Sequence, residues 1–236
     1  MHRFFVPSES IVGETVALPE HVASQLSRVL RSRVGDEIIV LDGTGMEYVL
    51  KLDAVDKNQA SGSILQKSPS EGEPSIAITL YQGILKADRF EFMLQKGTEV
   101  GITTFVPIDC QRTVSQNRPT PARYQRWRKI ITEAAEQSRR GRIPVLHEAI
   151  DFEVACAQAD GPSLIPWEEE TTSGLKSALK SWTSGQPISS ANIFIGPEGG
   201  FTSDEVELAR ERGITPVTLG KRILRAETAG VVAAAA

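Results

Sequence analysis

The chain has 236 residues, of which 40% are apolar and 24% are charged, and its formal net charge is −4. This composition is typical of a globular protein, and the acidic balance excludes nucleic-acid binding through overall charge alone. The first residues, MHRFFVPSES, have no apolar core of the length of a signal peptide, so we expect none, and no apolar run reaches the length of a membrane span. Cys110 and Cys156 lack metal-ligand spacing and fit reduced thiols, so we expect a soluble cytoplasmic protein.

Residues 1–70 predict a small β-barrel domain. Strand-like segments fill most of this region, at 3–6, 14–18, 37–43, 48–55 and 60–65. A single amphipathic helix interrupts them and carries four apolar residues on one face, Val22, Leu26, Val29 and Leu30. Many short strands in so few residues favour a barrel. The sequence SPSEGEPS at 68–75 is rich in Pro, Ser and Glu and predicts a linker after the barrel.

Residues 76–236 predict a second domain of the α/β class. Strand-like segments lie at 78–84, 104–108, 164–167, 192–196 and 216–220. The helical patterns cover 88–101, 121–140, 151–159, 173–183 and 203–212, and a last helix begins near Glu227. Strands that alternate with helices predict a mostly parallel sheet with helices on both faces.

The sequence IFIGPEGGFTSD at 193–204 predicts a buried strand, a glycine-rich turn and the start of a helix. Thr202 followed by Glu205 fits a capping box. Pro197 fixes φ and removes one backbone donor, while the glycines leave bare backbone. Such a turn can accept a ligand through its main chain. The alternative is a plain connection with a solvent-facing Glu198.

Two further segments end predicted strands, LIPWEEE at 164–170 and LGKRILRAETAG at 219–230. Because parallel strands end at one edge of a sheet, where α/β proteins bind ligands, we expect these three loops to line one cleft. In the alternative interpretation, Glu227 merely stabilises a helix N-terminus and Arg225 is its solvated neighbour. The dinucleotide motif G-x-G-x-x-G is absent, and LDGTG at 41–45 precedes a strand pattern, which favours a hairpin turn.

A basic region lies between residues 112 and 142, with nine lysines and arginines against two glutamates. Apolar residues at helical spacing predict that Arg126, Arg139 and Arg140 lie off the core face. The scarcity of acids favours phosphate contacts over a merely solvated face. A smaller basic cluster contains Arg28 and Arg31, for which solvation and RNA contact are equally acceptable. The three histidines lack partners at ligand spacing, so we expect no metal site.

The pattern IGPEGGFT-x-x-E at 195–205, followed by LG-x-RILR-x-ETA at 219–229, resembles the C-terminal signature of SPOUT-superfamily RNA methyltransferases. More narrowly, it resembles the RsmE-type family, which methylates N3 of a uridine in small-subunit ribosomal RNA. The resemblance extends to RFFVP at 3–7, SRVLR at 27–31, FEFMLQKGTEVGI at 90–102 and EAAEQSRRGRIP at 133–144, and so covers nearly the whole chain.

The resemblance implies a trefoil-knotted α/β domain at 76–236, preceded by a PUA-like β-barrel at 1–70 that helps to hold RNA. It also implies S-adenosylmethionine as cofactor and a homodimer that packs at the knot. The cofactor-binding residues would be Ile165, Ile195, Gly196, Pro197, Glu198, Gly199, Leu219, Gly220, Ile223, Leu224, Thr228 and Ala229.

The expected reaction is methylation of uridine N3 in 16S ribosomal RNA. Arg225 would stabilise charge that develops on the uracil, and Glu227 would orient that arginine or order the loop. The candidate RNA contacts are Arg3, Arg28, Arg31, Arg126, Arg139 and Arg140. Two alternatives are a nicotinamide-dependent oxidoreductase, which the missing dinucleotide motif opposes, and a non-catalytic RNA-binding protein, which leaves the glycine-bearing loops unexplained.

Overall fold

A computed structural model describes residues 1–114, 118–183 and 187–236, which divide into two compact units. Residues 1–73 and 135–143 form the first unit, and residues 74–134 and 144–236 form the second. The chain therefore returns to the first unit at 135–143, far in sequence from the rest of that unit. The composition change at 68–75 predicts a linker, but it cannot predict that a later segment packs back onto the first unit.

The first unit is built on a six-stranded sheet with the order β1-β4-β5-β6-β3-β2. The strands are β1 (Arg3–Phe5), β2 (Ile11–Val12), β3 (Thr15–Leu18), β4 (Glu37–Leu41), β5 (Met46–Val55) and β6 (Ala60–Pro69). The pair β1 and β4 is parallel, and the other neighbours are antiparallel. Alternate side chains such as Val16, Leu18, Leu50 and Leu52 point into one buried core, as the strand patterns predicted.

The helix of the first unit departs from the prediction at one residue. After the 3₁₀ turn η1 (Ser8–Ser10), α1 (Glu20–Ser24) runs into a π-helical segment, η2 (Gln25–Leu30). Val22 and Leu26 are buried and Leu30 packs against the core, but Val29 is 70% exposed. The prediction that Val29 shares the buried face is wrong, because i→i+5 hydrogen bonds put more residues into each turn than an α-helix has.

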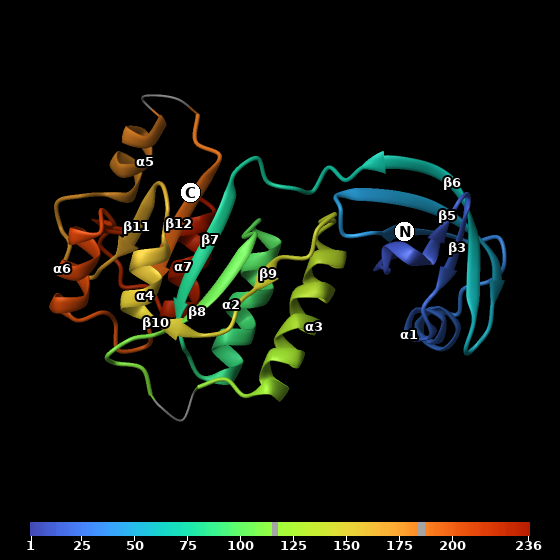
Figure 1. Cartoon of the computed structure of the whole chain (residues 1–236), viewed down its shortest axis with the longest axis horizontal. Coiled ribbons are helices and arrows are strands. Elements are labelled where there is room, and N and C mark those ends of the chain that lie inside the picture. Colours follow the sequence, from blue (N-terminus) through green and yellow to red (C-terminus); the bar gives the residue numbers. More distant parts are fainter. Residues whose placement is uncertain (115–117, 184–186) are drawn as a thin grey trace. The chain divides into compact units, whose positions relative to one another are not determined.

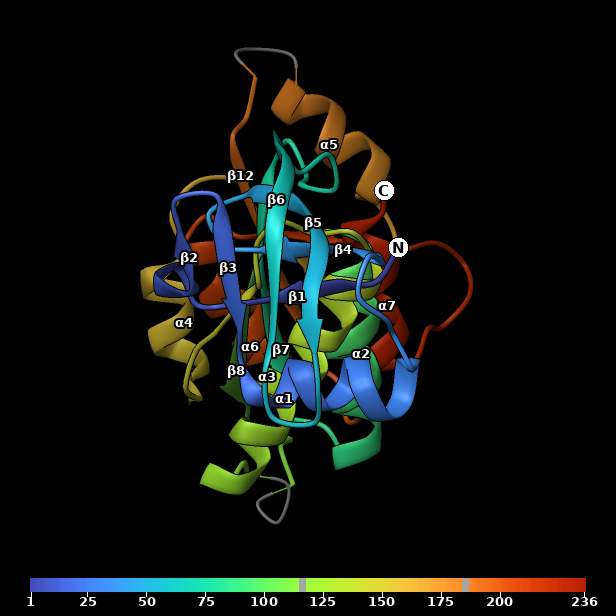
Figure 2. The same cartoon turned by 90° about the vertical axis from the view of Figure 1, so that its right-hand side faces the viewer.

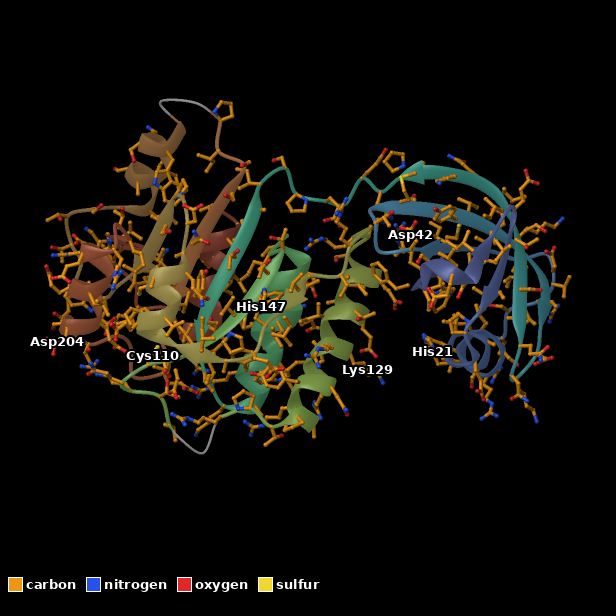
Figure 3. All side chains as sticks on the ribbon, viewed as in Figure 1. His21, Asp42, Cys110, Lys129, His147 and Asp204 are labelled. Carbon is orange, nitrogen blue, oxygen red and sulfur yellow. The ribbon has the colours of Figure 1, made fainter. Side chains whose placement is uncertain are left out.

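The segment LDGTG is a hairpin turn, as predicted. It joins β4 to β5, and Asp42 Oδ1 accepts hydrogen bonds from the Thr44 amide and hydroxyl at 2.9 and 2.7 Å. The Tyr48 hydroxyl donates to Asp42 Oδ2 at 2.9 Å. Both carboxylate oxygens of Asp42, which Figure 3 labels, therefore serve to hold its own turn.

The second unit contains a seven-stranded sheet with the order β10-β8-β7-β12-β11-β13, and β9 also pairs with β8. The strands are β7 (Ala77–Gly83), β8 (Thr104–Asp109), β9 (Val145–Leu146), β10 (Ile150–Asp151), β11 (Ser163–Pro166), β12 (Ser190–Ile195) and β13 (Thr215–Val217). All of these pairings are parallel, which confirms the predicted sheet. The strands β9 and β10 were not predicted, because two residues are too few to show the alternation of apolar and polar side chains that marks a strand.

Helices cover both faces of this sheet (Figure 1), as predicted. They are α2 (Ala87–Glu99), α3 (Pro121–Gln137), α4 (Phe152–Gln158), α5 (Leu175–Thr183), α6 (Ser203–Glu211) and α7 (Ala226–Ala234). Ile193 and Ile195 of β12 join a core with α2, α3 and α7, whereas Phe194 faces the core with α4 and α6. The central strand thus buries both faces, which explains its unbroken apolar run.

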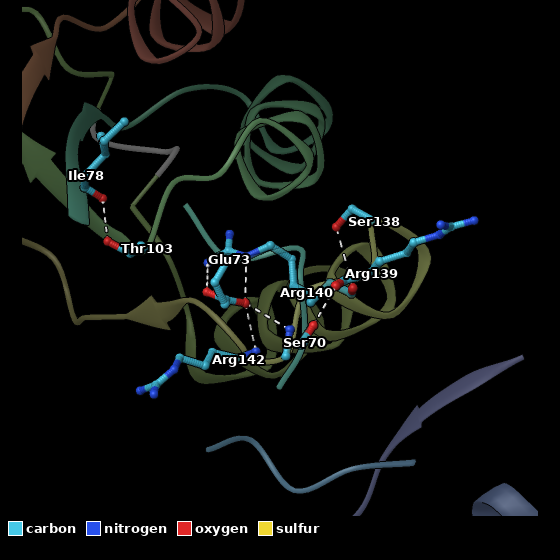
Figure 4. A network of polar contacts seen from close by, with 10 residues as sticks. Ser70, Glu73, Ile78, Thr103, Ser138, Arg139, Arg140 and Arg142 are labelled. Atoms are coloured by element: carbon cyan, nitrogen blue, oxygen red, sulfur yellow. Dashed lines mark hydrogen bonds and ion pairs between the residues drawn. The ribbon is translucent and has the colours of Figure 1, made fainter. Parts of the chain in front are cut away.

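A buried ion pair holds the returning segment 135–143 within the first unit (Figure 4). The Glu73 carboxylate accepts hydrogen bonds from Arg140 Nε and Nη2 at 3.2 and 3.1 Å. The Gly141 and Arg142 amides donate to the same carboxylate at 2.8 and 3.0 Å. Burial alone would raise the pKa of Glu73, but these hydrogen bonds and the Arg140 charge outweigh it and lower the pKa below its usual value.

This network corrects the prediction for Arg140. Its side chain is 2% exposed and binds Glu73, so it does not lie on an outer basic face. The neighbouring Arg139 is exposed, and its side chain points away from Glu73 (Figure 4). Arg139 has φ 62°, in the left-handed region, which turns consecutive side chains to different sides. Helical spacing could not place them because α3 ends at Gln137.

We predict that Glu73→Gln lowers the free energy of unfolding at pH 7 by on the order of 3 kcal/mol, because it leaves a buried guanidinium without its carboxylate. Since folding lowers the pKa of Glu73, its contribution is complete above the unfolded-state pKa and is lost as pH falls through the folded-state value. Denaturant titrations from pH 3 to 7 should therefore show a shallower acid loss in the variant than in the wild type. The exposed neighbour Glu71→Gln is the control, and identical pH profiles for all three proteins would contradict the prediction.

Candidate functional site

The second unit has a cavity of about 900 Å³ at the carboxyl ends of β11, β12 and β13. Three loops line most of it, with residues from 166–171, 195–201 and 218–229. This arrangement confirms the prediction that the three strand-end loops share one cleft. The wall mixes apolar side chains, such as Ile195 and Leu219, with charged ones, and concave sites of this composition bind small molecules.

The loop after β12 forms a tight turn and then caps α6. The Gly200 amide donates to the Pro197 carbonyl at 3.0 Å, and Gly200 has φ 69°, a conformation that favours glycine. The Glu205 amide donates to the Thr202 hydroxyl, and the Glu205 carboxylate accepts from the Thr202 amide at 2.8 Å. The predicted capping box is therefore confirmed.

The end of β7 supports this turn from the neighbouring strand. Gln82 is fully buried, and its Nε2 donates to the Gly196 carbonyl at 3.3 Å. Gly83 lies so close that a Cβ there would be 2.3 Å from Pro197 N and 2.6 Å from the Gly196 carbonyl carbon. Only glycine fits a backbone approach of this kind. Neither residue was predicted as part of the site, although YQGI at 81–84 is the end of a predicted strand.

The carboxylate of Glu198 has partners on another element, so it does not simply face solvent as the alternative interpretation of the turn expected. Its Oε1 accepts a hydrogen bond from the Lys86 amide at 3.0 Å and lies 3.6 Å from Arg89 Nη1. Lys86 is the N-cap residue of α2. The carboxylate therefore ties the turn to the N-terminus of a second helix, where a negative charge is favourable.

The loop 218–225, which precedes α7, is the exposed wall of the cavity and projects from its unit (Figure 2). Gly220 has φ 107°, and a Cβ added there would meet no atom within 4 Å. The side chain of Ile223 is 91% exposed, while Leu224 packs partly against the core. This wall therefore leaves open space beside Gly220 that a ligand can fill.

Arg225 and Glu227 stand at the start of α7. Arg225 is its N-cap residue, and its side chain is 78% exposed. Its Nη1 lies 4.0 Å from Glu227 Oε1. Glu227 is only 8% exposed, and its Oε2 is buried with no hydrogen-bond partner among the described residues. A buried carboxylate oxygen without a donor is costly, so this atom is suited to receive one from a bound molecule.

Charges of both signs line the cavity. Glu168, Glu170 and Glu198 lie on the loops after β11 and β12, and Lys221, Arg222 and Arg225 lie on the loop before α7. Hydrogen bonds from the Thr172 hydroxyl and from the Ser173 and Thr172 amides lower the pKa of Glu170 to about 2. That carboxylate is therefore ionised at neutral pH. A ligand that carries both cationic and anionic groups is complementary to such a wall.

The structure does not bring every predicted residue to the cavity. The side chain of Ile165 is fully buried in the core between the sheet, α4 and α6, and Pro166 and Trp167 line the cavity in its place. Thr228 also lies off the wall, although Glu227 and Ala229 on either side of it contribute to it. The other predicted cofactor positions all line the cavity. Strand and helix periodicity explain both corrections, because adjacent residues point in different directions.

Within the described ranges, no group of three or more His, Cys, Asp or Glu residues is arranged to hold a metal ion. The same part of the chain has no helix that is both long and apolar enough to span a bilayer. Cys110 and Cys156 are buried free thiols, and burial raises the pKa of Cys156 to about 12.

Known proteins match the chain over both units. Residues 72–236 match the family model of the RNA methyltransferase domain, and residues 26–65 match that of the RNA methyltransferase PUA domain. The chain belongs to the RNA methyltransferase family. The N-terminal sheet is accordingly a PUA-like domain, as expected, and the parallel sheet with its cavity is the methyltransferase domain.

Full-length relatives of this RNA methyltransferase are named ribosomal RNA small subunit methyltransferase E. The Synechocystis protein is 35% identical over 99% of this chain and 76% of its own length. The Bacillus subtilis protein is 32% identical over 100% of this chain and 95% of its own length. The Neisseria gonorrhoeae enzyme of that name was solved bound to S-adenosyl methionine. It superposes with a TM-score of 0.88 at 34% identity, over 100% of this chain and 95% of that one.

We predict that Gly83→Ala lowers the free energy of unfolding by about 1–3 kcal/mol, because its methyl group would collide with the backbone at Gly196 and Pro197. Gly174→Ala is the matched control, since a Cβ there meets no atom within 4 Å. Its stability should stay within about 0.5 kcal/mol of the wild type. Equal midpoints of the two variants in chemical denaturation would show that the close contact between β7 and the turn does not constrain the chain.

Proposed function

We propose that this chain methylates N3 of a uridine in 16S ribosomal RNA with S-adenosylmethionine as the methyl donor. The observation that carries the proposal is the cavity at three strand-end loops, in a chain that matches a relative solved with that cofactor over its full length. The names of the curated relatives supply the substrate class, ribosomal RNA of the small subunit.

The cavity residues suit S-adenosylmethionine, which joins an adenosine to a sulfonium and to an amino-acid group with both charges. Ile195, Leu219 and Leu224 offer apolar surface, and the open space at Gly220 gives access to bare backbone. The carboxylates of Glu168, Glu170 and Glu198 are complementary to cationic groups. The residues that we propose to hold the cofactor are Ile195, Gly196, Pro197, Glu198, Gly199, Leu219, Gly220, Ile223, Leu224 and Ala229.

When bound, the cofactor supplies an electrophilic methyl group on a positively charged sulfur. Uracil N3 carries a weakly acidic proton, so its attack on the methyl group requires that the proton leave, and the negative charge then spreads to the two carbonyl oxygens of the base. The exposed guanidinium of Arg225 at the cavity wall can stabilise that charge. Glu227, 4.0 Å away, orients Arg225, and its unpartnered Oε2 can accept a hydrogen bond from the bound molecules.

Four arginines are the proposed phosphate contacts. Arg28, Arg31 and Arg139 are exposed, and Arg126 is 68% exposed although it pairs with Glu91 of α2. Arg140 binds Glu73, and the side chain of Arg3 pairs with Glu47 and is 10% exposed, so neither is a proposed phosphate contact. Acids from other elements thus neutralise part of the basic region, which the local sequence could not reveal.

We further propose that the enzyme works as a homodimer and that its C-terminal segment forms a trefoil knot, as the family resemblance implies. The resemblance supports both proposals, and the exposed loop 218–225, with Ile223 91% exposed, offers apolar surface that a second subunit can cover. An RNA of the small ribosomal subunit as substrate would place the enzyme in the cytoplasm with the ribosome.

The function itself is tested by incubating the purified chain with S-adenosylmethionine and small-subunit RNA from cells that lack the enzyme. Mass spectrometry of the digested RNA should then detect 3-methyluridine at one position. Absence of the product with both naked RNA and assembled subunits would contradict the proposal.

We predict that Arg225→Ala binds S-adenosylmethionine nearly as the wild type does but loses on the order of 10²–10³ in single-turnover methylation, the effect of removing one charge-stabilising donor. Arg225→Lys should recover little, because a point charge does not reproduce a planar fork of donors. The exposed Arg212→Ala, outside the cavity, is the control. A full rate for Arg225→Ala at saturating substrate and cofactor would refute the catalytic role.

We predict that the double variant Arg126→Ala/Arg139→Ala binds RNA more weakly, with a log–log salt slope smaller by about two, one per lost phosphate contact. Filter binding at several salt concentrations measures this slope. The control double variant Lys176→Ala/Arg212→Ala removes two exposed cations elsewhere and should keep it. If both doubles retain the wild-type slope, the two arginines belong to a solvated face.

A further inference from the structure

Arg112 forms hydrogen bonds with the turn at 196–201 from outside the cavity. Its Nη1 donates to the Gly199 carbonyl at 2.7 Å and to the Phe201 carbonyl at 3.3 Å. The methylene groups of Arg112 lie along the same turn, since a Cβ on Gly199 would be 3.1 Å from Arg112 Cβ and 3.3 Å from its Cδ. Arg112 does not line the cavity, whereas Gly199 and Phe201 do.

The segment that carries Arg112 is itself fixed. It follows β8, where the Cys110 amide donates to the Thr113 hydroxyl at 2.9 Å and the Thr113 amide donates to the Cys110 carbonyl at 3.0 Å. The Gln111 amide donates to Glu205 Oε1 at 2.8 Å. Glu205 is 4% exposed and also closes the capping box of α6. The segment is thus attached to the turn through Arg112 and to the first turn of α6 through Gln111.

Arg112 completes the hydrogen bonding of two peptide groups in the cavity wall. In the peptide group between Gly199 and Gly200, the carbonyl accepts a hydrogen bond from Arg112 and the amide donates one to the Pro197 carbonyl. In the peptide group between Phe201 and Thr202, the carbonyl accepts a hydrogen bond from Arg112 and the amide donates one to the Glu205 carboxylate. A peptide plane held at both ends cannot rotate without breaking a hydrogen bond.

We propose that Arg112 is a positioning residue of the cofactor site: it sets the peptide planes of the turn and thereby the affinity for S-adenosylmethionine, without touching the ligand. This inference rests on the proposed function. It separates Arg112 from Arg126 and Arg139, whose proposed partners are phosphates. If loss of the guanidinium leaves the turn in its binding conformation only a tenth of the time, the apparent dissociation constant rises about tenfold.

The position of Arg112 adds a second reason for a glycine at 199, beside the bare backbone that it offers to a ligand. A Cβ at Gly199 would meet the Arg112 side chain, so the glycine makes room for the residue that holds the turn.

The test compares Arg112→Ala, Arg112→Lys and, as matched control, Arg118→Ala, which removes a cation that pairs with Asp109. Calorimetry should give an S-adenosylmethionine dissociation constant raised about tenfold in Arg112→Ala and by less in Arg112→Lys, because one ammonium can replace the single Nη1 that donates to both carbonyls but lacks the fixed geometry of the guanidinium. The salt slope of RNA binding and the thermal midpoint should stay unchanged in Arg112→Ala. Arg118→Ala should keep the wild-type cofactor affinity.

An unchanged dissociation constant with a salt slope lowered by about one would assign Arg112 to phosphate binding and overturn the inference. A lower thermal midpoint with equal losses in cofactor and RNA binding would make it a general stabiliser and overturn it as well. A second measurement needs no ligand: the ¹⁵N NMR signals of the Gly200 and Thr202 amides should broaden in Arg112→Ala. If the wild type bound no cofactor, the proposed function would fail, while these signals would still decide whether Arg112 fixes the turn.

Discussion

Hydrogen bonds from neighbouring strand ends fix the backbone at 196–201, and the rest of the site depends on this restraint. Gln82 reaches the Gly196 carbonyl from β7, the Lys86 amide reaches Glu198 from the start of α2, and Arg112 reaches two carbonyls from the segment after β8. The parallel sheet makes this possible, because β8, β7 and β12 lie side by side and end at one edge. Glycines allow the close approaches that these contacts require.

A wall that is held before the ligand arrives binds more tightly, because less conformational entropy is lost on association. The opposite wall, 218–225, differs in that Ile223 and Arg225 are largely exposed and Gly220 faces open space. The site therefore combines one fixed side, where the chain presents backbone and carboxylates, with one exposed side that carries Arg225. This division suits a reaction in which a cofactor must be seated and a base from a large RNA must then be admitted.

Much of the second domain could be predicted from the sequence because its signals are local. The unbroken apolar run at 193–195 marks a central strand, Thr202 and Glu205 mark a cap, and strand ends in a parallel sheet must share an edge. The failures are long-range. The partner of Arg140 is Glu73, 67 residues away, and Arg112 acts on a turn 87 residues further on. The prediction that Val29 is buried failed for a local reason, the π-helical turn, which the residue types do not indicate.

The central claim is that the turn at 196–201 is formed before the ligand binds. Hydrogen–deuterium exchange of the wild-type chain, measured with and without S-adenosylmethionine, tests it most directly. The account predicts slow exchange of the Gly200 and Thr202 amides in both states, with new protection confined to 218–225. Fast exchange at Gly200 and Thr202 that becomes slow only when S-adenosylmethionine is added would contradict it.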